Sequence, residues 1–332
     1  MIITFLYALL FCFLLEMLYF QIANRFHIID KPNERSSHST ITIRGGGVIF
    51  PFAIISGIII YQPALIYLVI AVFLIGTISF LDDIITLSSK IRISIHLASV
   101  SLILFQISTS VDDANLYLNP LSFILVLSAF IIIIGMINAY NFMDGINGMT
   151  VLYSLVTLIS FWFIQHQLNI PLLDNNIFLL LLASLVVFGF FNLRKKAKTF
   201  TGDVGSISIA LLFCFLLVTL MVATENLKWI LLLGIYGLDA VATIICRIIR
   251  KENIFEAHRS HFYQYLANEQ KWSHVLITII FSVFQILLNL ILIFTNHLLP
   301  VVCTYLTIII IYIMARLRLE GKKRLFENYN TM

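Results

Sequence analysis

Apolar runs long enough to cross a membrane recur along the whole sequence. A transmembrane helix needs about 20 mostly apolar residues. The chain is 60% hydrophobic and 11% charged, whereas a soluble domain is about 45–50% apolar and about 25% charged. The sequence therefore predicts an all-α, polytopic membrane protein that forms one domain over residues 1–332, with about eleven transmembrane helices. These are expected at residues 2–22, 46–61, 64–81, 93–108, 120–137, 149–165, 177–193, 205–222, 229–246, 275–295 and 298–315.

The basic residues alternate between successive loops. Every Lys and Arg except Lys228 falls in a loop that follows an odd-numbered span or in the tail after the last span. Cytoplasmic loops carry an excess of Lys and Arg, so we expect the N-terminus outside and the C-terminus in the cytoplasm. The first apolar run has no basic residue before it and no cleavage site after it, so we expect a retained helix rather than a signal peptide.

Two adjacent carboxylates, Asp82 and Asp83, end the third span on the predicted cytoplasmic side. Neighbouring helical residues point about 100° apart, so the two side chains should serve different partners. A solvated helix end is the alternative. However, acidic residues at a helix C-terminus oppose the helix dipole, which favours a functional role.

A second polar cluster contains Asn138, Asn141 and Asp144, which recur every three residues and would share one face of a helix. Gly145 and Gly148 follow and allow close backbone approach. Carboxylate and amide oxygens suit Mg²⁺, which proteins usually hold with one or two carboxylates plus substrate phosphates. The alternative is a capped turn between two helices.

The segment Phe200–Ser206 places Gly202, Asp203 and Gly205 just before an apolar helix. A glycine-rich helix N-terminus favours an anion, and with the other acidic sites on the same side Asp203 becomes a candidate metal ligand. The alternative is that Asp203 is only a helix N-cap.

His258 and His261 are spaced to share a helical face, with Arg259 between them. Histidine and arginine are good donors to a diphosphate. A basic segment that contacts lipid headgroups is the alternative for Arg247, Arg250 and Lys251 upstream. It explains the histidine pair poorly.

Two further acidic residues lie inside apolar runs, Glu16 and Asp239. An ionisable residue within a membrane span is a functional hypothesis by default. For Asp239, pairing with a neighbouring helix is an equally good explanation. The sequence offers no account of Glu16.

Together these motifs resemble the polyprenyl-phosphate N-acetylhexosamine-1-phosphate transferase family of bacterial membranes, which is bacterial glycosyltransferase family 4. The resemblance covers nearly the whole chain, and its last stretch is most similar to the branch that initiates O-antigen and other surface polysaccharides. The family usually has a Lys-Pro-Thr-Pro-like run before its glycines, where Thr40-Ile41-Thr42-Ile43 stands here. The motifs that carry the resemblance are Asp30–His38, Asp82-Asp83, Asn138–Gly148, Phe200–Ser206 and Ala257–Gln264.

The resemblance implies transfer of N-acetylhexosamine 1-phosphate from a UDP-N-acetylhexosamine to undecaprenyl phosphate, with release of UMP. It places this reaction at the cytoplasmic face of the bacterial inner membrane, where it would start a lipid-linked surface glycan such as that of lipopolysaccharide. It assigns catalysis to Asp82, Asp83, Asp144 and Asp203, and Mg²⁺, or Mn²⁺ instead, to Asp203, Asn141 and Asp144. The substrate-binding residues that it implies are Asn138, Asn141, Asn192, Phe200, His258, Arg259 and His261, with Phe200 stacking on uridine.

The implied reaction brings two anions together, and a metal ion with cationic donors would reduce their repulsion. One alternative is the phospho-N-acetylmuramoyl-pentapeptide transferase reaction of peptidoglycan synthesis. Another is a secondary transporter, which would need acidic residues near the midplane and often has inverted repeats. Here the acidic clusters gather on one side and no repeat is evident. We expect membrane lipid and no nucleic acid as partners, and a homodimer remains an open alternative.

Overall fold

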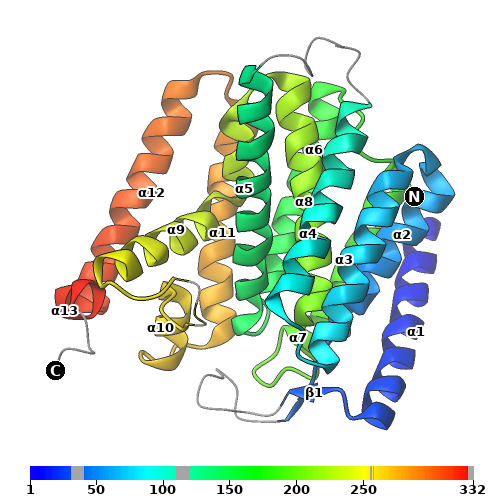
Figure 1. Cartoon of the computed structure of the whole chain (residues 1–332), viewed down its shortest axis with the longest axis horizontal. Coiled ribbons are helices and arrows are strands. Elements are labelled where there is room, and N and C mark those ends of the chain that lie inside the picture. The colour runs from blue at the N-terminus through cyan, green and yellow to red at the C-terminus, as the bar shows by residue number, and fades with distance from the viewer. Residues whose placement is uncertain (31–40, 110–119, 255, 257, 328–332) are drawn as a thin grey trace.

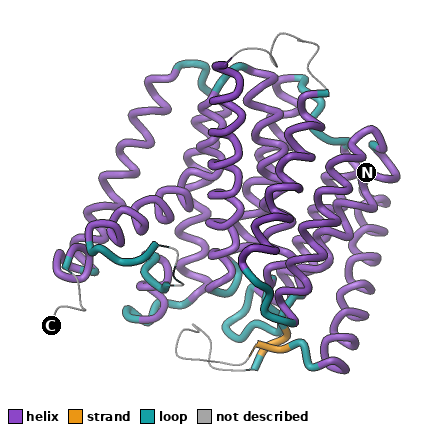
Figure 2. Tube along the Cα trace, viewed as in Figure 1, coloured by secondary structure: helices purple, strands orange, loops and turns teal. Residues whose placement is uncertain are grey.

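The structure is a computed structural model that describes residues 1–30, 41–109, 120–254, 256 and 258–327. Nearly all of its regular structure is helical (Figures 1 and 2). The elements are α1 (Ile2–Phe26), β1 (Ile29–Asp30), β2 (Thr42–Ile43), η1 (Gly46–Val48), α2 (Ile49–Tyr61), η2 (Pro63–Leu65), α3 (Ile66–Ile84), α4 (Ser89–Ser108), α5 (Pro120–Phe142), η4 (Met143–Gly145), α6 (Met149–Leu168), α7 (Asn175–Asn192), α8 (Gly202–Thr224), η5 (Leu227–Leu233), α9 (Gly234–Ile249), α10 (Phe262–Asn268), α11 (His274–Phe294), α12 (Leu298–Leu319) and α13 (Gly321–Phe326).

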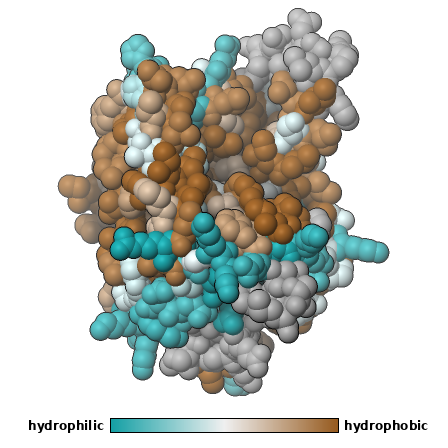
Figure 3. Space-filling model, turned by 90° about the vertical axis from the view of Figure 1, so that its left-hand side faces the viewer, coloured by the Kyte–Doolittle hydropathy of each residue, from teal (hydrophilic) through white to brown (hydrophobic). Residues whose placement is uncertain are grey.

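The all-α, polytopic fold is confirmed. In the described part of the chain, 10 helices are long and apolar enough to cross a membrane, and the apolar helix Gly46–Tyr61 is shorter. Hydrophilic residues gather at one end of the molecule, while hydrophobic residues cover most of the surface above it (Figure 3). The helices α10 and α13 and the β1–β2 pair were not predicted, because each is too short to produce a periodic pattern.

Helix α8 is the centre of the bundle. It packs against α2, α3 and α5, and nearly every residue from Val204 to Leu217 is buried. A helix that is hydrophobic all round is either buried in the protein or faces lipid, and here its neighbours cover it. The start of α8, at Gly202, therefore has a fixed position among the surrounding helices.

Helix α9 leaves the bundle obliquely, whereas most of the other long helices run side by side (Figure 1). The change of direction follows the 3₁₀ turn η5 and would leave backbone N–H groups unpaired. Side chains from α6 and α11 accept them: Ile235 N donates to Gln285 Oε1 at 2.9 Å, and Tyr236 N donates to the Tyr153 hydroxyl at 3.3 Å. Irregular backbone inside a membrane protein needs such internal partners.

The hydrophilic end is organised by a short strand pair. Strands β1 and β2 are antiparallel, with Ile29 opposite Ile43, and Ile43 also bridges Thr199 in a parallel arrangement. Phe200 N donates to Ile43 O at 2.8 Å. The segment that follows β2, which begins with Arg44, therefore lies beside the segment that leads into α8.

Candidate active site

Two carboxylates from other elements hold the N-terminus of α8. Asp83, in the last turn of α3, accepts the backbone N–H groups of Asp203 and Val204 at 3.0 and 3.1 Å. Asp144, in η4, accepts those of Thr201 and Gly202 at 3.2 and 2.9 Å. The first N–H groups of a helix have no partner within the helix, and its N-terminus carries partial positive charge. Asp83 and Asp144 therefore pair with N–H groups that have no partner within α8.

Glycine is required where these segments meet. Gly202 has a φ of +68°, and a Cβ there would lie 2.5 Å from Asp83 Oδ2 and 2.8 Å from the Cα of Gly45. One turn later, a Cβ on Gly205 would lie 2.5 Å from the Cα of Gly47. The glycines predicted to cradle a ligand thus let the backbone segments approach each other.

Arg44 connects two of the predicted acids. Its Nε lies 2.8 Å from Asp83 Oδ1, and its Nη2 lies 3.7 Å from Asp203 Oδ1. The Tyr19 hydroxyl, from α1, donates to Arg44 O at 2.5 Å and fixes the backbone. Burial alone would lower the pKa of Arg44, but the neighbouring carboxylates raise it above its ordinary value, so the guanidinium stays charged.

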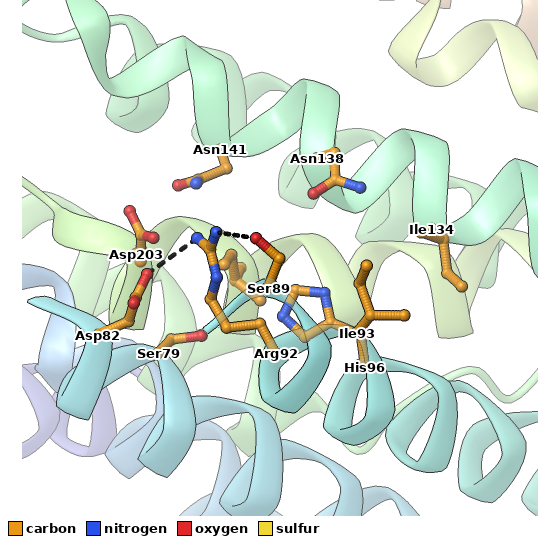
Figure 4. Close-up of a pocket in the computed structure, with 11 residues that line it drawn as sticks. Ser79, Asp82, Ser89, Arg92, Ile93, His96, Ile134, Asn138, Asn141 and Asp203 are labelled. Atoms are coloured by element: carbon orange, nitrogen blue, oxygen red, sulfur yellow. Dashed lines mark hydrogen bonds and ion pairs between the residues drawn. The ribbon is translucent and has the colours of Figure 1, made fainter. Parts of the chain in front are cut away.

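A pocket of about 400 Å³ lies beside this junction, between α3, α4, α5 and α8 (Figure 4). Asp82 and Asp203 face it together with Arg92, whose Nη1 lies 3.0 Å from Asp82 Oδ2. Asp82 also accepts the backbone N–H of Leu87 at 2.7 Å. The prediction that Asp82 and Asp83 serve different partners is confirmed. The complete lining is Ser79, Asp82, Ser89, Arg92, Ile93, His96, Ile134, Asn138, Asn141, Asp203 and Ile207.

The asparagines predicted with Asp144 separate from it in the structure. Helix α5 ends at Phe142, so Asn138 and Asn141 lie on the helix and line the pocket, while Asp144 lies on the turn after it. The expectation of one helical face for all three was therefore wrong for Asp144. Asn141 accepts the Ser206 hydroxyl at 2.5 Å and lines the pocket together with Asp203.

The histidine segment adopts a different backbone from the one expected. Residues 258–261 are not helical, and α10 begins only after His261. The rings of His258 and His261 nevertheless lie close, with centroids 5.0 Å apart. Burial, followed by the nearby His261 and Arg247, lowers the pKa of His258 to about 4, so its imidazole is neutral at physiological pH. Arg259 is exposed.

Phe142 joins the histidine segment to the acidic cluster. Its ring centroid lies 5.8 Å from that of His258 and 5.7 Å from that of His261. The Tyr263 hydroxyl donates to Phe142 O at 2.5 Å. Because Phe142 directly follows Asn141, the structure brings the two predicted clusters together.

Two predicted nucleotide contacts have structural partners. Asn192 is buried, accepts Gly148 N at 2.7 Å and donates to Thr199 O at 2.8 Å. It therefore ties the segment after α7 to the start of α6. Phe200 is also buried. Contact of Asn192 and Phe200 with uridine stays a prediction, as do the catalytic, metal and substrate roles of the other site residues.

Two of the three basic residues before the histidines, Arg247 and Arg250, form bonds inside the protein, whereas Lys251 is exposed. Arg247 and Arg250 are both buried. Both bond Glu252, with Nε–carboxylate distances of 2.9 and 2.5 Å, and Arg250 also donates to Arg324 O at 3.0 Å. For these two arginines the lipid-headgroup alternative was wrong, because their charge is used inside the protein.

Sequence reasoning missed the cationic partners Arg44 and Arg92 and the pocket residue His96. Arg44 directly precedes the glycine cluster and Arg92 follows the acidic pair by one short loop, which are weak signals. Both lie in loops or span ends that the positive-inside rule already explained. Glu16 is buried beside Gly46, and nothing among the described residues explains its carboxylate.

The chemistry of the donor set suits a metal ion that also binds substrate. Among the described residues, no three His, Cys, Asp or Glu side chains are grouped so that they could hold a metal. Asp83 and Asp144 have both carboxylate oxygens engaged by backbone N–H groups. Asp82 and Asp203 face the pocket, where Asp82 is bonded by Leu87 N and Arg92. Mg²⁺ is usually held by one or two carboxylates with water and phosphate oxygens, so the residues present fit Mg²⁺.

The chain is similar to a glycosyl transferase family and to two kinds of transferase within the curated proteins. Residues 65–221 match the model of glycosyl transferase family 4. The chain is 26% identical to the probable undecaprenyl-phosphate N-acetylglucosaminyl 1-phosphate transferase of Bacillus subtilis (strain 168), over 80% of this chain and 76% of that protein. It is 28% identical to the undecaprenyl-phosphate alpha-N-acetylglucosaminyl 1-phosphate transferase of Thermotoga maritima, over 81% and 83%. It is 27% identical to the phospho-N-acetylmuramoyl-pentapeptide-transferase of Thermotoga neapolitana, over 74% and 82%.

Proposed function

We propose that the chain is a membrane glycosyl-1-phosphate transferase of glycosyl transferase family 4, whose model matches residues 65–221. In this proposal it transfers N-acetylhexosamine 1-phosphate from a UDP-sugar to undecaprenyl phosphate and releases UMP. The observation that carries the proposal is the pocket at the start of α8. There Asp82 and Asp203 stand beside Arg92, with Arg44 behind them. The two aspartates could bind a metal ion, and the two arginines could bind the phosphates of the substrates.

The reaction needs little help from a base. The attacking group is an oxygen of the lipid phosphate, and a phosphomonoester has a second pKa of about 6. It is therefore mostly ionised at neutral pH, and the main barrier is repulsion between two anions. Arg92 and Arg44 supply fixed positive charge, and Arg259 is exposed near His258 to contact the diphosphate. Such positioned charge is the main source of rate enhancement in phosphoryl transfer.

Asp203 is the first choice as metal ligand, with Asp82 as the second carboxylate of the pocket and the Asn141 amide beside Asp203. When bound, Mg²⁺ would neutralise diphosphate charge and polarise the phosphorus that is attacked. Asp83 and Asp144 hold the backbone that presents Asp203. The prediction that Asp144 is itself a ligand is tested by the same metal-binding measurements.

The position of the pocket suits one soluble and one lipid substrate. It lies at the end of the bundle where α8 starts, and Ile93, Ile134 and Ile207 add apolar lining to its charged residues. We place this end at the cytoplasmic face of the bacterial inner membrane, because the loops that carry nearly all Lys and Arg lie on the same side of the predicted topology. The N-terminus would then be outside and the C-terminus inside.

The relatives differ in the UDP-sugar from which they transfer the sugar phosphate. Relatives of two kinds match the chain, N-acetylglucosaminyl 1-phosphate transferases and phospho-N-acetylmuramoyl-pentapeptide transferases. We place this chain with the first kind, as an enzyme that initiates a surface glycan, because Ala257–Gln264 is similar to that branch. The peptidoglycan reaction is the second candidate.

The test measures UMP released by the purified protein in detergent with undecaprenyl phosphate and Mg²⁺. The donors are UDP-N-acetylglucosamine, UDP-N-acetylgalactosamine and UDP-N-acetylmuramoyl-pentapeptide, and omission of the lipid phosphate is the control. We expect lipid-dependent UMP from a UDP-N-acetylhexosamine. Release only from the pentapeptide donor would assign the peptidoglycan reaction. Absence of UMP with every donor, from protein that is folded and monodisperse, would reject the proposal.

A further inference from the structure

Asp239 is a buried carboxylate that the proposed reaction does not use. It lies on α9 and accepts three hydrogen bonds, from His261 Nδ1 at 2.8 Å, Phe262 N at 2.9 Å and the Tyr312 hydroxyl at 2.8 Å. We infer that Asp239 is a positioning residue: through His261, it sets the orientation and the tautomer in which this imidazole meets the diphosphate of the sugar nucleotide. This inference rests on the proposed function, in which His261 binds the diphosphate.

The hydrogen bonds define the tautomer. An ionised carboxylate can only accept, so the bond between Asp239 Oδ2 and His261 Nδ1 requires the hydrogen on Nδ1. The other ring nitrogen, Nε2, is buried and has no hydrogen-bond partner among the described residues. Buried polar atoms are nearly always paired. The unpaired Nε2 of His261, whose ring lies 5.7 Å from that of Phe142, is therefore available to bond substrate.

The ring cannot easily turn away from this position. Tyr236 and Tyr263 stack against His261, with centroid distances of 6.3 and 5.4 Å, and Phe142 lies 5.7 Å away. The same Phe142 contacts His258, and its neighbour Asn141 lines the pocket. The aromatic rings and the Asp239 bond together fix the imidazole next to the acidic cluster.

A second anchor comes from α12, which buries only 11% of its span. Its Arg316 is buried and donates to the Tyr312 hydroxyl and to Ser260 O, each at 3.2 Å. Glu320, one turn further on, accepts Arg316 Nε at 2.5 Å. A chain of bonds therefore runs from Glu320 through Arg316 and Tyr312 to Asp239. Figure 1 shows α9, α10 and α12 together on one side of the molecule.

A simpler explanation is that Asp239 only caps α10 through Phe262 N. The geometry separates the two roles, because Phe262 and Tyr312 bond Oδ1 whereas His261 bonds Oδ2. In an Asp239→Asn variant, the amide oxygen stays with the two donors on the Oδ1 side and the amide NH₂ faces His261. The cap is kept, and His261 must then accept at Nδ1 and carry its hydrogen on Nε2.

The first test is a double-mutant cycle on kcat/KM for the UDP-sugar, with Asp239→Asn, His261→Ala and the double variant. Loss of a residue that orients a functional histidine typically costs about 10–100-fold. We expect Asp239→Asn to lower kcat/KM by about this factor, and the double variant to be no worse than His261→Ala alone. Tyr312→Phe, which leaves the other two donors to Asp239 in place, is the matched control and should lose only a few-fold.

Independent effects that multiply in the double variant would overturn the inference, as would full activity in Asp239→Asn. Thermal midpoints in detergent show whether each variant is folded.

The second test does not depend on activity. In protein labelled with ¹⁵N-histidine, the His261 signals, assigned by their absence in His261→Ala, should show hydrogen on Nδ1 in the wild type and on Nε2 in Asp239→Asn. An unchanged tautomer would overturn the inference. If the wild type showed the expected tautomer but no UMP release with any donor, the proposed function would fail while the Asp239–His261 arrangement stood.

Discussion

Asp83 Oδ1 accepts the backbone N–H of Asp203 at 3.0 Å, so the acidic pair that ends α3 reaches the first turn of α8. A carboxylate at the C-terminal end of one helix is thereby stabilised by the N-terminal end of another. The same oxygen lies 2.8 Å from Arg44 Nε. This contact separates two kinds of acid in the site. Asp83 shapes the backbone, and Asp203 presents its side chain to the pocket.

Asp83→Asn should damage both stability and transfer. An amide has one acceptor oxygen, so it cannot accept both backbone N–H groups and also pair with Arg44. Leaving a buried donor unpaired costs about 1–3 kcal/mol, which should lower the thermal midpoint in detergent. We expect UMP release to fall at least about 100-fold. A variant with an unchanged midpoint would show that the cap is unimportant.

Asp203→Asn should abolish transfer without lowering stability. Its side chain faces the pocket, and the substitution does not change the hydrogen bond from its backbone N–H to Asp83. We expect transfer to be abolished while the thermal midpoint stays close to that of the wild type. The measurements are UMP release and loss of Mg²⁺ binding by titration calorimetry. Near wild-type turnover would remove the metal assignment.

Gly202→Ala should destabilise the junction at the start of α8. The backbone φ of +68° is unfavourable for alanine, and the new Cβ would lie 2.5 Å from Asp83 Oδ2. Gly321→Ala is the matched control, because Gly321 also has positive φ, +80°, but no atom within 4 Å of the added Cβ. Backbone strain alone costs about 1–2 kcal/mol, so the control should show a smaller fall in thermal midpoint and keep its transfer activity. Equal effects in the two variants would mean that the close approach adds nothing.

Removal of divalent ions should stop the reaction. With no group of three metal-binding side chains among the described residues, we expect weak Mg²⁺ binding that strengthens with the UDP-sugar, because the substrate phosphates complete the coordination. EDTA should abolish UMP release, and added Mg²⁺ or Mn²⁺ should restore it. Full activity in EDTA would contradict the metal assignment.

His258 should make the thermal stability of the protein fall in acid, below about pH 6.5. Its pKa of about 4 lies below the unfolded value of about 6.5. The unfolded chain therefore binds the proton first, and the contribution of His258 to stability is present above about pH 6.5 and is lost as pH falls toward 4. Between pH 6.5 and 4.5, the thermal midpoint of wild type should fall more steeply than that of His258→Gln. Parallel curves would show that His258 does not titrate with a lowered pKa.

The sequence predicted the spans well because hydrophobic length is a strong local signal. Its prediction of different partners for Asp82 and Asp83 also held, since a helix turns neighbouring residues apart. Spacing failed where the helix stopped: α5 ends before Asp144, and the chain is not helical at His258 and His261. Asp239 could not be assigned, because its partners lie 22 and 73 positions away along the chain.

The burial of α8 bears on how a lipid reaches the pocket. This helix is enclosed on all sides, and its first turn is tied to α3 and η4 by side chains that cannot be released singly. Asp203 is therefore a stationary reference point, and it does not travel toward its substrates. Under the proposed function, the phosphate of the lipid would therefore have to come to Asp203 at the start of α8.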